Sequence, residues 1–321
     1  QRQMCIRDSP DAGHGPNFYG GDLEQGFILL EDLGEQHHSL VEPLLGDDPE
    51  PARSALLAYA DRMGQMHADS MMQLERYYEM AGALHPDLVP TQIDAAQLRA
   101  DASAQSSKLE ELGLPFEAAY HDEIRRVTES ILDPGPFLTY IHRDACPDNN
   151  AIYPDGTLRL IDFELGHIGH ALLDITYARM YMPSCWCSNV IPSPLVDNME
   201  ATYRRALVHA CPAADKDELF DSALMDVCAF WLSRTLNALP SVMEKDWEWG
   251  LATYRPRIMA RLEAFISSAR HTNYLPACCA TAERLHEELT KRWSDLEPLP
   301  LYPACLLYTS DAADEGCGGG A

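Results

Sequence analysis

The sequence predicts an α+β fold in which a short, strand-rich beginning precedes a large and mostly helical region that holds one β-hairpin. Helices are indicated because long stretches after residue 50 repeat apolar residues at spacings of three and four. The hairpin is indicated by two short apolar runs, 151–153 and 158–161, that flank the turn sequence Pro154-Asp155-Gly156. The chain has 321 residues, which is enough for one large or two modest domains.

The predicted elements follow one another along the chain. Residues 10–26 are rich in Gly, Pro and Asp and are predicted as loop, whereas 26–34 is predicted as a strand that ends at an acidic turn. A long helix is predicted from Glu50 to Ala83, with Pro51 in its first turn. A strand at 137–141 precedes the hairpin. The remaining predicted helices span 93–112, 116–132, 193–210, 215–238, 245–270 and 277–293.

The composition argues against two classes of partner. The formal net charge of −26 argues against nucleic acid, whose phosphates attract Lys and Arg surfaces, and would suit either a plain acidic surface or a cationic substrate. No apolar run reaches the roughly 18 residues that a membrane helix needs, so no membrane partner is expected. The ten cysteines lack zinc-ribbon spacing and are predicted to be buried free thiols in a reducing cytosol, which favours a cytoplasmic protein.

The two ends of the chain are related to each other through DNA. One back-translation of residues 1–9 is CAGCGTCAGATGTGTATAAGAGACAG, and its reverse complement, translated one base in, gives the sequence of residues 305–312. This DNA resembles the adapter of transposon-based sequencing libraries. We therefore interpret residues 1–9 and 305–321 as adapter-derived tails that do not belong to the natural fold. The first residue is then not expected to be the natural N-terminus.

One loop concentrates the chemistry of the chain. His142-x-Asp144 and then Asn149 follow the predicted strand, and Asp162 ends the second strand of the hairpin. Folding of the hairpin brings Asn149 and Asp162 to the same end, where an amide and a carboxylate oxygen form the hard ligand set that Mg²⁺ prefers beside phosphate oxygens. Asp144 is placed to accept a hydrogen bond from an attacking hydroxyl. A lone His-x-Asp would indicate only a turn, so the prediction depends on the Asn, the hairpin and Asp162 being in register.

These motifs resemble those of the aminoglycoside phosphotransferase and choline kinase group, the small-molecule relatives of protein kinases. The loop resembles the H-G-D-x-x-x-x-N pattern of the group, 160–164 its I-D-F/W-E/D segment, and 169–175 its G-D-P-x-x-D-L stretch. Residues 29–34 resemble the strand that enters the interlobe hinge, and 59–68 resembles the L-A-x-L-H helix. The resemblance covers residues 17–270 and implies a protein kinase-like fold with a mostly helical C-lobe.

The resemblance also implies the site and the activity. Asp144 would be the catalytic base, and Asn149 and Asp162 would hold Mg²⁺ on the phosphates of ATP. The implied reaction transfers the γ-phosphate to a hydroxyl of a small molecule, such as an aminoglycoside, a choline-like amine or a sugar, and leaves the acceptor open. The other implied positions are the backbone of Leu30, Glu31 and Asp32, which would meet the adenine, and the side chains of His142, Glu164 and Asp174, which would support the loop and the metal segment.

Two departures from the family pattern refine this interpretation. Arg143 replaces the usual Gly, as in protein kinases, but Glu164 stands in place of the Gly of D-F-G and no A-P-E follows, which argues against a protein kinase. The phosphate-covering loop and Lys of the nucleotide lobe do not fit before residue 28, so we expect a chain whose N-lobe β-sheet is largely missing and which is nearly inactive by itself. The predicted divisions are an N-lobe and hinge remnant at 10–34 and a C-lobe at 35–304, with the catalytic loop at 140–150, the metal-binding segment at 160–166 and the helical substrate region at 190–295.

Two other functions remain open from the residues. One is a metal-dependent hydrolase, in which His167 and His170 would bind Zn²⁺ or Mn²⁺ with His142, Asp144 and Asp162, although Gly166 and Gly169 argue against a helix that would bring the two histidines to one face. The other is a catalytically dead kinase-like binding module. The aromatic residues Trp231, Trp247 and Trp249 lie in the predicted late helices, where core packing is favoured over an aromatic cage for a cationic amine.

Overall fold

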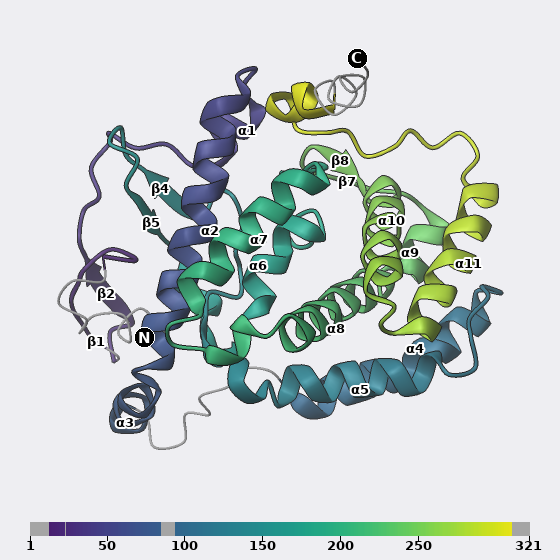
Figure 1. The fold of residues 1–321 in the computed structure, drawn as a ribbon, viewed down its shortest axis with the longest axis horizontal. Coiled ribbons are helices and arrows are strands. Elements are labelled where there is room, and N and C mark those ends of the chain that lie inside the picture. The colour runs from purple at the N-terminus through teal and green to yellow at the C-terminus, as the bar shows by residue number, and fades with distance from the viewer. Residues whose placement is uncertain (1–12, 23, 85–93, 310–321) are drawn as a thin grey trace, which may run out of the picture.

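The computed structural model describes residues 13–22, 24–84 and 94–309. It confirms the predicted α+β class. Two-stranded sheets lie beside the long helix α2 (Pro49–Met71) at the left of Figure 1, and a helical region fills the right half. The catalytic loop predicted from the sequence follows β3 (Leu138–Ile141).

An antiparallel hairpin begins the described chain. β1 (Phe18–Asp22) pairs with β2 (Phe27–Leu30) at the left edge of Figure 1. The prediction of a loop over residues 10–26 is therefore wrong for β1. Gly20 and Gly21 concealed this strand, because Gly is depleted in strands and interrupts the apolar alternation. Hydrogen bonding with β2 uses only the backbone, so it forms without a strand-favouring residue or an apolar side chain at these positions.

The long helix α2 begins at a well-formed cap. The Asp48 side chain accepts a hydrogen bond from the Glu50 N–H at 3.1 Å, and Pro49 occupies the first turn. The predicted helix 50–83 is divided in the structure, because α2 ends at Met71 and α3 (Leu74–Leu84) continues in another direction. No Gly or Pro marks this division, which is why the periodicity ran across it.

α2 packs closely along α7 (Ser193–Leu207), as Figure 1 shows. Gly64 permits the approach, because a Cβ at this position would lie 2.7 Å from the carbonyl oxygen of Tyr203 and 2.8 Å from the Cβ of Ala206. α2 also buries Tyr59, whose hydroxyl bonds the Ala145 carbonyl oxygen of the catalytic loop, and His67, whose ring bonds Asp174. A short helix, α1 (Val41–Leu45), precedes α2.

The helical region agrees with the prediction except at one point. α9 (Leu239–Glu244) and a small hairpin of β7 (Glu248–Trp249) and β8 (Ala252–Thr253) replace the predicted start of the helix 245–270. Asp246 explains the difference, because its carboxylate accepts hydrogen bonds from the N–H groups of Tyr254 and Arg255 and so fixes the beginning of the next helix. The predicted helices correspond to α4 (Ala95–Glu111), α5 (Tyr120–Leu132), α7, α8 (Asp217–Leu236), α10 (Tyr254–Thr272) and α11 (Pro276–Arg292).

Short strands frame the central loops. The predicted hairpin is present as β4 (Asn150–Ile152) and β5 (Leu158–Leu160), paired in antiparallel register. β3 pairs with β6 (His167–His170), which the sequence did not predict because Gly169 within it and Gly166 before it hide the strand. β6 leads directly into α6 (Leu172–Arg179), which carries Asp174 beneath the catalytic loop.

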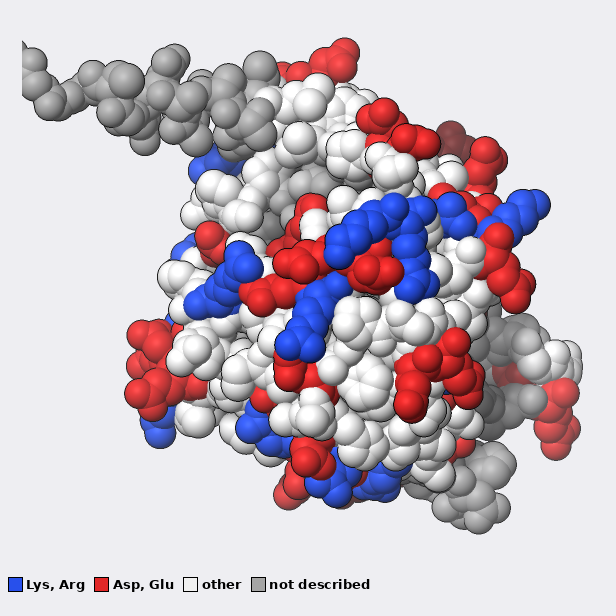
Figure 2. Space-filling model, turned by 90° about the vertical axis from the view of Figure 1, so that its right-hand side faces the viewer, with Lys and Arg blue, Asp and Glu red and all other residues white. Residues whose placement is uncertain are grey.

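The surface and the chain end complete the fold. Figure 2 shows acidic and basic side chains intermixed on the face formed by the right-hand side of Figure 1. One pair between α10 and α11 is Arg270 with Glu283, at 2.7 Å. Of the predicted tails, residues 1–9 lie outside the described residues, and the short helix η5 (Pro303–Thr309) buries Cys305. Among the described helices, none combines the length and the apolar character that crossing a membrane requires.

Candidate functional site

The hairpin brings two of the predicted metal ligands to one end. Asn150 lies opposite Leu160 in the strand register, and the Ile161 N–H donates to the Asn149 carbonyl oxygen at 3.0 Å, one residue beyond the strands. Asp162 therefore follows directly beside Asn149. The Asp162 backbone adopts a left-handed conformation with φ of 64°, and its side chain is exposed at this end of the hairpin. Glu164 lies exposed in the short helical turn that follows (η3, Phe163–Leu165).

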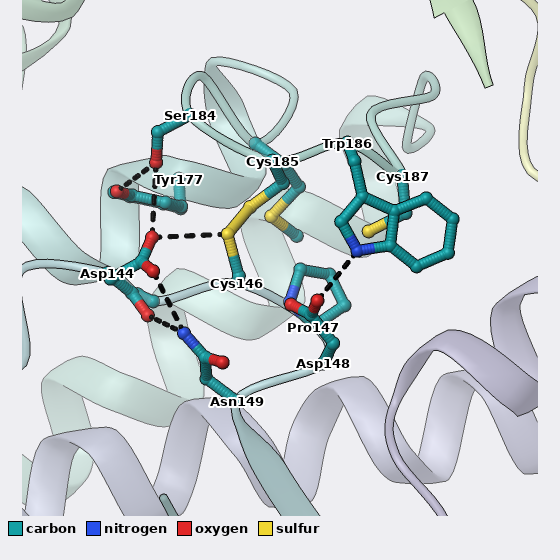
Figure 3. Close-up of a disulfide and its surroundings, with 12 residues drawn as sticks. Asp144, Cys146, Pro147, Asp148, Asn149, Tyr177, Ser184, Cys185, Trp186 and Cys187 are labelled. Carbon is teal, nitrogen blue, oxygen red and sulfur yellow. Dashed lines mark hydrogen bonds between the residues drawn. A yellow bond between two sulfur atoms is a disulfide. The ribbon is translucent and has the colours of Figure 1, made fainter. Parts of the chain in front are cut away.

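Asp144 is oriented by Asn149. The Asn149 Nδ2 donates to the Asp144 carboxylate at 3.0 Å and to the Asp144 carbonyl oxygen at 2.9 Å (Figure 3). This arrangement turns the amide oxygen of Asn149 away from Asp144, which leaves it available as a ligand for a hard cation. It also fixes Oδ2 of Asp144 and leaves Oδ1 directed toward the loop that contains Ser184.

A buried carboxylate supports the loop from below. Asp174 is fully buried and accepts hydrogen bonds from the His142 N–H at 2.7 Å, the Arg143 N–H at 2.9 Å and the His67 ring at 3.0 Å. Burial alone would raise the pKa of Asp174, but the hydrogen bond and charge of His67, with His142, outweigh it and lower the pKa. The bonds hold Arg143 in a left-handed conformation, with φ of 71°, at the position where Gly is usual in the resembling family.

His142 joins the two halves of the site. Its Nε2 donates to the Ile161 carbonyl oxygen at 2.8 Å, and its ring packs on Phe163 with the centroids 4.6 Å apart. The ring therefore links the catalytic loop to the segment that carries Asp162. From α2, the Tyr59 hydroxyl donates to the Ala145 carbonyl oxygen at 2.7 Å and holds the loop from the other side.

A disulfide between Cys146 and Cys185 corrects the prediction that the cysteines are free thiols. Its two cysteines are 39 residues apart in sequence, and their positions carry no spacing signal, so only the fold brings them together. The described cysteines that remain are free and buried, as predicted: Cys187, Cys211, Cys228, Cys278, Cys279 and Cys305.

The loop that carries Cys185 was not identified as part of the site from the sequence. Its Ser184 hydroxyl lies 3.3 Å from Oδ1 of Asp144 and 2.7 Å from the Tyr177 hydroxyl, and the Trp186 Nε1–H donates to Asp148 at 2.6 Å. Figure 3 shows this loop lying along the catalytic loop on the side of Asp144.

The predicted nucleotide positions lie at the end of β2. The Glu31 carboxylate accepts from Arg159 at 2.8 Å and from the Asn17 side chain at 2.9 Å. The Glu31 N–H is already donated to the Asn17 carbonyl oxygen at 2.7 Å, which removes it from the groups that could meet an adenine. Leu30 and Asp32 flank this residue, and the Asp32 side chain accepts from the Gly34 N–H.

The histidines of the hydrolase alternative do not converge. His167 and His170 are three residues apart on β6, so their side chains project to opposite faces of the strand. The ring of His170 stacks on Phe137, and burial lowers its pKa to about 3. Within the described residues, no group of three His, Cys, Asp or Glu side chains is arranged to hold a metal ion.

The three tryptophans pack against the protein's own side chains. Trp231 is buried, and the guanidinium of Arg143 lies 5.3 Å from its ring centroid. Trp247 and Trp249 both pack on Tyr254, at centroid distances of 4.8 and 6.2 Å.

A separate groove of about 1010 Å³ lies between α7, α8, α10 and α11, but it contains none of the predicted site residues, and its buried Glu200 is paired with Arg179.

Comparison with known proteins identifies a protein family for this chain. The model of the Phosphotransferase enzyme family matches residues 12–213, which is more than half of the chain. This match, together with the helical region and the hairpin described above, shows the protein kinase-like fold that the sequence predicted. No curated protein sequence matches the chain significantly.

Solved structures with a similar arrangement share little sequence with this chain. The choline kinase LicA from Streptococcus pneumoniae is 14% identical, with a TM-score of 0.36 over 80% of this chain and 76% of that one. An ethanolamine kinase from Plasmodium vivax is 15% identical, with a TM-score of 0.47 over 82% of this chain and 72% of that one. An aminoglycoside phosphotransferase from Alicyclobacillus acidocaldarius is 14% identical, with a TM-score of 0.38 over 91% of this chain and 82% of that one.

Proposed function

The chain belongs to the Phosphotransferase enzyme family, and from this premise we propose that it transfers the γ-phosphate of ATP to a hydroxyl group of a small molecule in a Mg²⁺-dependent reaction. The observation that carries the proposal is the convergence of Asp144, Asn149 and Asp162 at one end of the β4–β5 hairpin. We also propose that the protein is cytoplasmic and that its acceptor is a small hydroxylated molecule, and a cationic acceptor would suit the net charge of −26.

Asp144 acts as the base in this proposal. Its Oδ2 is fixed by the Asn149 amide, so Oδ1 is the oxygen that accepts the hydrogen bond of the acceptor hydroxyl. As the bond between the γ-phosphorus and its bridging oxygen breaks, the acceptor oxygen bonds to phosphorus and its proton passes to Asp144. A raised pKa is not required, because orientation and charge stabilisation dominate a loose phosphoryl transition state.

Asn149 and Asp162 fit a magnesium ion through their oxygen atoms. The amide oxygen of Asn149 faces away from Asp144, and the exposed Asp162 carboxylate contributes a full negative charge beside it. Mg²⁺, when bound, would neutralise the charge that develops on the β- and γ-phosphates. His142 and Asp174 act through the backbone, since they fix the strand end and the loop from which these ligands project.

The nucleotide would enter from the side of β2 in this proposal. Because the Glu31 N–H is bonded to Asn17, contact with the adenine falls to the remaining backbone groups of Leu30 to Asp32. The Glu31–Arg159 ion pair joins this segment to the β4–β5 hairpin that holds the metal ligands. Nucleotide and metal would therefore be held by two hairpins that are directly connected.

Asp144→Asn is the substitution that tests the proposal. It keeps the shape of the side chain but removes its capacity to accept a proton, so we expect turnover to fall by at least about 100-fold. Binding of Mg²⁺–ADP, measured by calorimetry, should stay close to that of the wild type. Asp155→Asn, in the exposed turn of the same hairpin, is the matched control and should leave both unchanged.

The assay follows ADP release and phosphorylated product over a panel of hydroxylated amines, aminoglycosides and sugars. It is run on this chain with nucleotide binding measured in parallel, so that loss of transfer and loss of binding can be distinguished. Equal loss of turnover and nucleotide binding in Asp144→Asn would indicate a structural role for Asp144. Nucleotide binding without transfer to any acceptor, in every form tested, would support the binding-module alternative instead.

A further inference from the structure

Three successive residues of one loop contact three alternate residues of the catalytic loop. We refer to Ser184–Trp186 as the clamp segment. Its contact pairs are Ser184 with Asp144, Cys185 with Cys146, and Trp186 with Asp148. The middle contact is the disulfide, which lies in the short stretch between Asp144 and Asn149 (Figure 3). The clamp segment therefore runs alongside the catalytic loop and is covalently bonded to it between Asp144 and Asn149.

The clamp segment is itself anchored to the helical region. Arg257 of α10 is fully buried and donates to the carbonyl oxygens of Cys185 at 2.7 Å, of Trp186 at 3.0 Å and of Trp249. The Leu251 N–H also donates to the Trp186 carbonyl oxygen, at 3.0 Å. Because the anchor is buried and hydrogen-bonded, the disulfide ties the catalytic loop to a rigid support and not to a free loop.

We propose that the Cys146–Cys185 disulfide is a positioning element of the phosphotransferase site and that its reduction slows transfer, so that the site responds to thiol–disulfide conditions. The inference rests on the proposed function, since Asp144 is the base only in that proposal. Reduction is a two-electron step in which a dithiol gives up two electrons and two protons, the Sγ–Sγ bond breaks to two thiols, and the dithiol closes to its own disulfide.

Two effects slow the reduced form. The first is loss of the covalent tether, which leaves only the hydrogen bonds of Ser184 and Trp186 between the clamp segment and the catalytic loop, and small displacements of a base are costly in rate. The second concerns the sulfur of Cys146, which lies 3.2 Å from Oδ1 of Asp144. A disulfide sulfur carries no proton, so this is only a contact, but a thiol at the same place donates a hydrogen bond to the oxygen that must receive the acceptor hydroxyl.

Protein purified without reductant is divided into an oxidised sample and a sample treated with a small dithiol, and alkylation with mass spectrometry counts the thiols in each. We expect kcat to fall about tenfold on reduction, while KM for the nucleotide changes little, at an assay temperature well below the thermal midpoints of both samples. Amide exchange of residues 144–149 should become faster in the reduced sample, a readout that does not require turnover. Cys228→Ser, which removes a buried free thiol of α8, should keep the full redox response.

Substitutions separate the two effects. Cys146→Ala and Cys185→Ala both remove the tether, but only Cys185→Ala leaves a thiol beside Asp144, so its kcat should be the lower of the two, and neither should respond to the dithiol. Equal kcat in the oxidised and reduced wild type, or free thiols at Cys146 and Cys185 in protein that was never reduced, would overturn the inference. Reduction that occurs only on unfolding would do the same. If no sample transfers phosphate to any acceptor, but amide exchange at 144–149 becomes faster on reduction, the proposed function is wrong. The inference that the disulfide holds the catalytic loop in place is then still supported.

Discussion

Replacement of Asp174 by Asn probes the support of the catalytic loop. Asp174 is fully buried, and its carboxylate accepts from the His142 and Arg143 N–H groups and from the His67 ring. Asn can place its single amide oxygen at the position that serves both His142 and His67. Its NH₂ group then faces the Arg143 N–H, which loses its acceptor, so two buried donors oppose each other.

The cost of Asp174→Asn follows from these contacts. One hydrogen bond to a charged group is lost, worth about 1.5–3 kcal/mol, and at least one buried donor is left unpaired, which adds about 1–3 kcal/mol. We therefore expect the free energy of unfolding to fall by about 3–5 kcal/mol at pH 7. The lowered pKa of Asp174 gives the pH dependence, because its stabilisation is present above the ordinary aspartate pKa of about 3.9 and is lost as the pH falls through the folded-state pKa.

Urea unfolding of wild type and Asp174→Asn, followed by circular dichroism between pH 7 and pH 3, measures both quantities. The difference in unfolding free energy should be constant above about pH 4 and should shrink below it. Asp155→Asn, at an exposed turn carboxylate that accepts from one backbone N–H, is the control and should stay close to wild type. A difference below about 1 kcal/mol at pH 7, or one that persists undiminished in acid, would refute the assigned role of the buried carboxylate.

Three further substitutions test other contacts. Gly64→Ala should lower the urea midpoint by an amount that corresponds to about 1–3 kcal/mol, since its Cβ would lie 2.7 Å from the Tyr203 carbonyl oxygen; an unchanged midpoint would contradict the close packing. Arg143→Gly relieves a left-handed backbone but loses the contact with the Trp231 ring, so stability should stay within about 1 kcal/mol, and a double-mutant cycle with Trp231→Leu should isolate the ring contact. His170→Asn keeps an acceptor for its backbone partner but removes a group whose pKa is lowered to about 3, so the loss of stability as the pH falls from 6.5 toward 3 should be smaller than in wild type, and an identical pH profile would count against the burial of His170 as its cause.

The part of the site that is local in sequence could be predicted from it. The β4–β5 hairpin could be recognised from its turn and its two apolar runs. Pairing of its strands then brings Asn149 and Asp162 close together, as the hydrogen bond from the Ile161 N–H to the Asn149 carbonyl oxygen shows. The long helices could also be predicted, because the spacing of apolar residues that indicates a helix is a local property of the sequence. The roles of Asp144, Asn149 and Asp162 remain a proposal.

The part that depends on distant residues could not be predicted. Cys146 and Cys185 are joined only because α6 and the loop after it return to the catalytic loop, and no spacing announces this. β1 and β6 are formed by pairing with distant or adjacent strands despite their glycines, so their own composition argues against them. The helix predicted over 245–270 begins late because the Asp246 side chain caps a residue eight positions onward.

The stability of the β1–β2 hairpin would enter into the affinity for a nucleotide that binds beside β2, as proposed above. The hairpin exposes Phe27, Ile28 and Leu29, and it is joined to β4–β5 through contacts such as the Glu31–Arg159 pair. An isolated two-stranded hairpin is only marginally stable in water, so opening of this one would cost little free energy beyond the loss of its contacts with β4–β5. A ligand that binds only the closed form is then measured with its intrinsic dissociation constant divided by the closed fraction, so a hairpin closed one-tenth of the time would weaken the apparent affinity about tenfold. Binding and hairpin closure would in that case be coupled equilibria, and a substitution that stabilises β1 against β2 would also raise the affinity for the nucleotide.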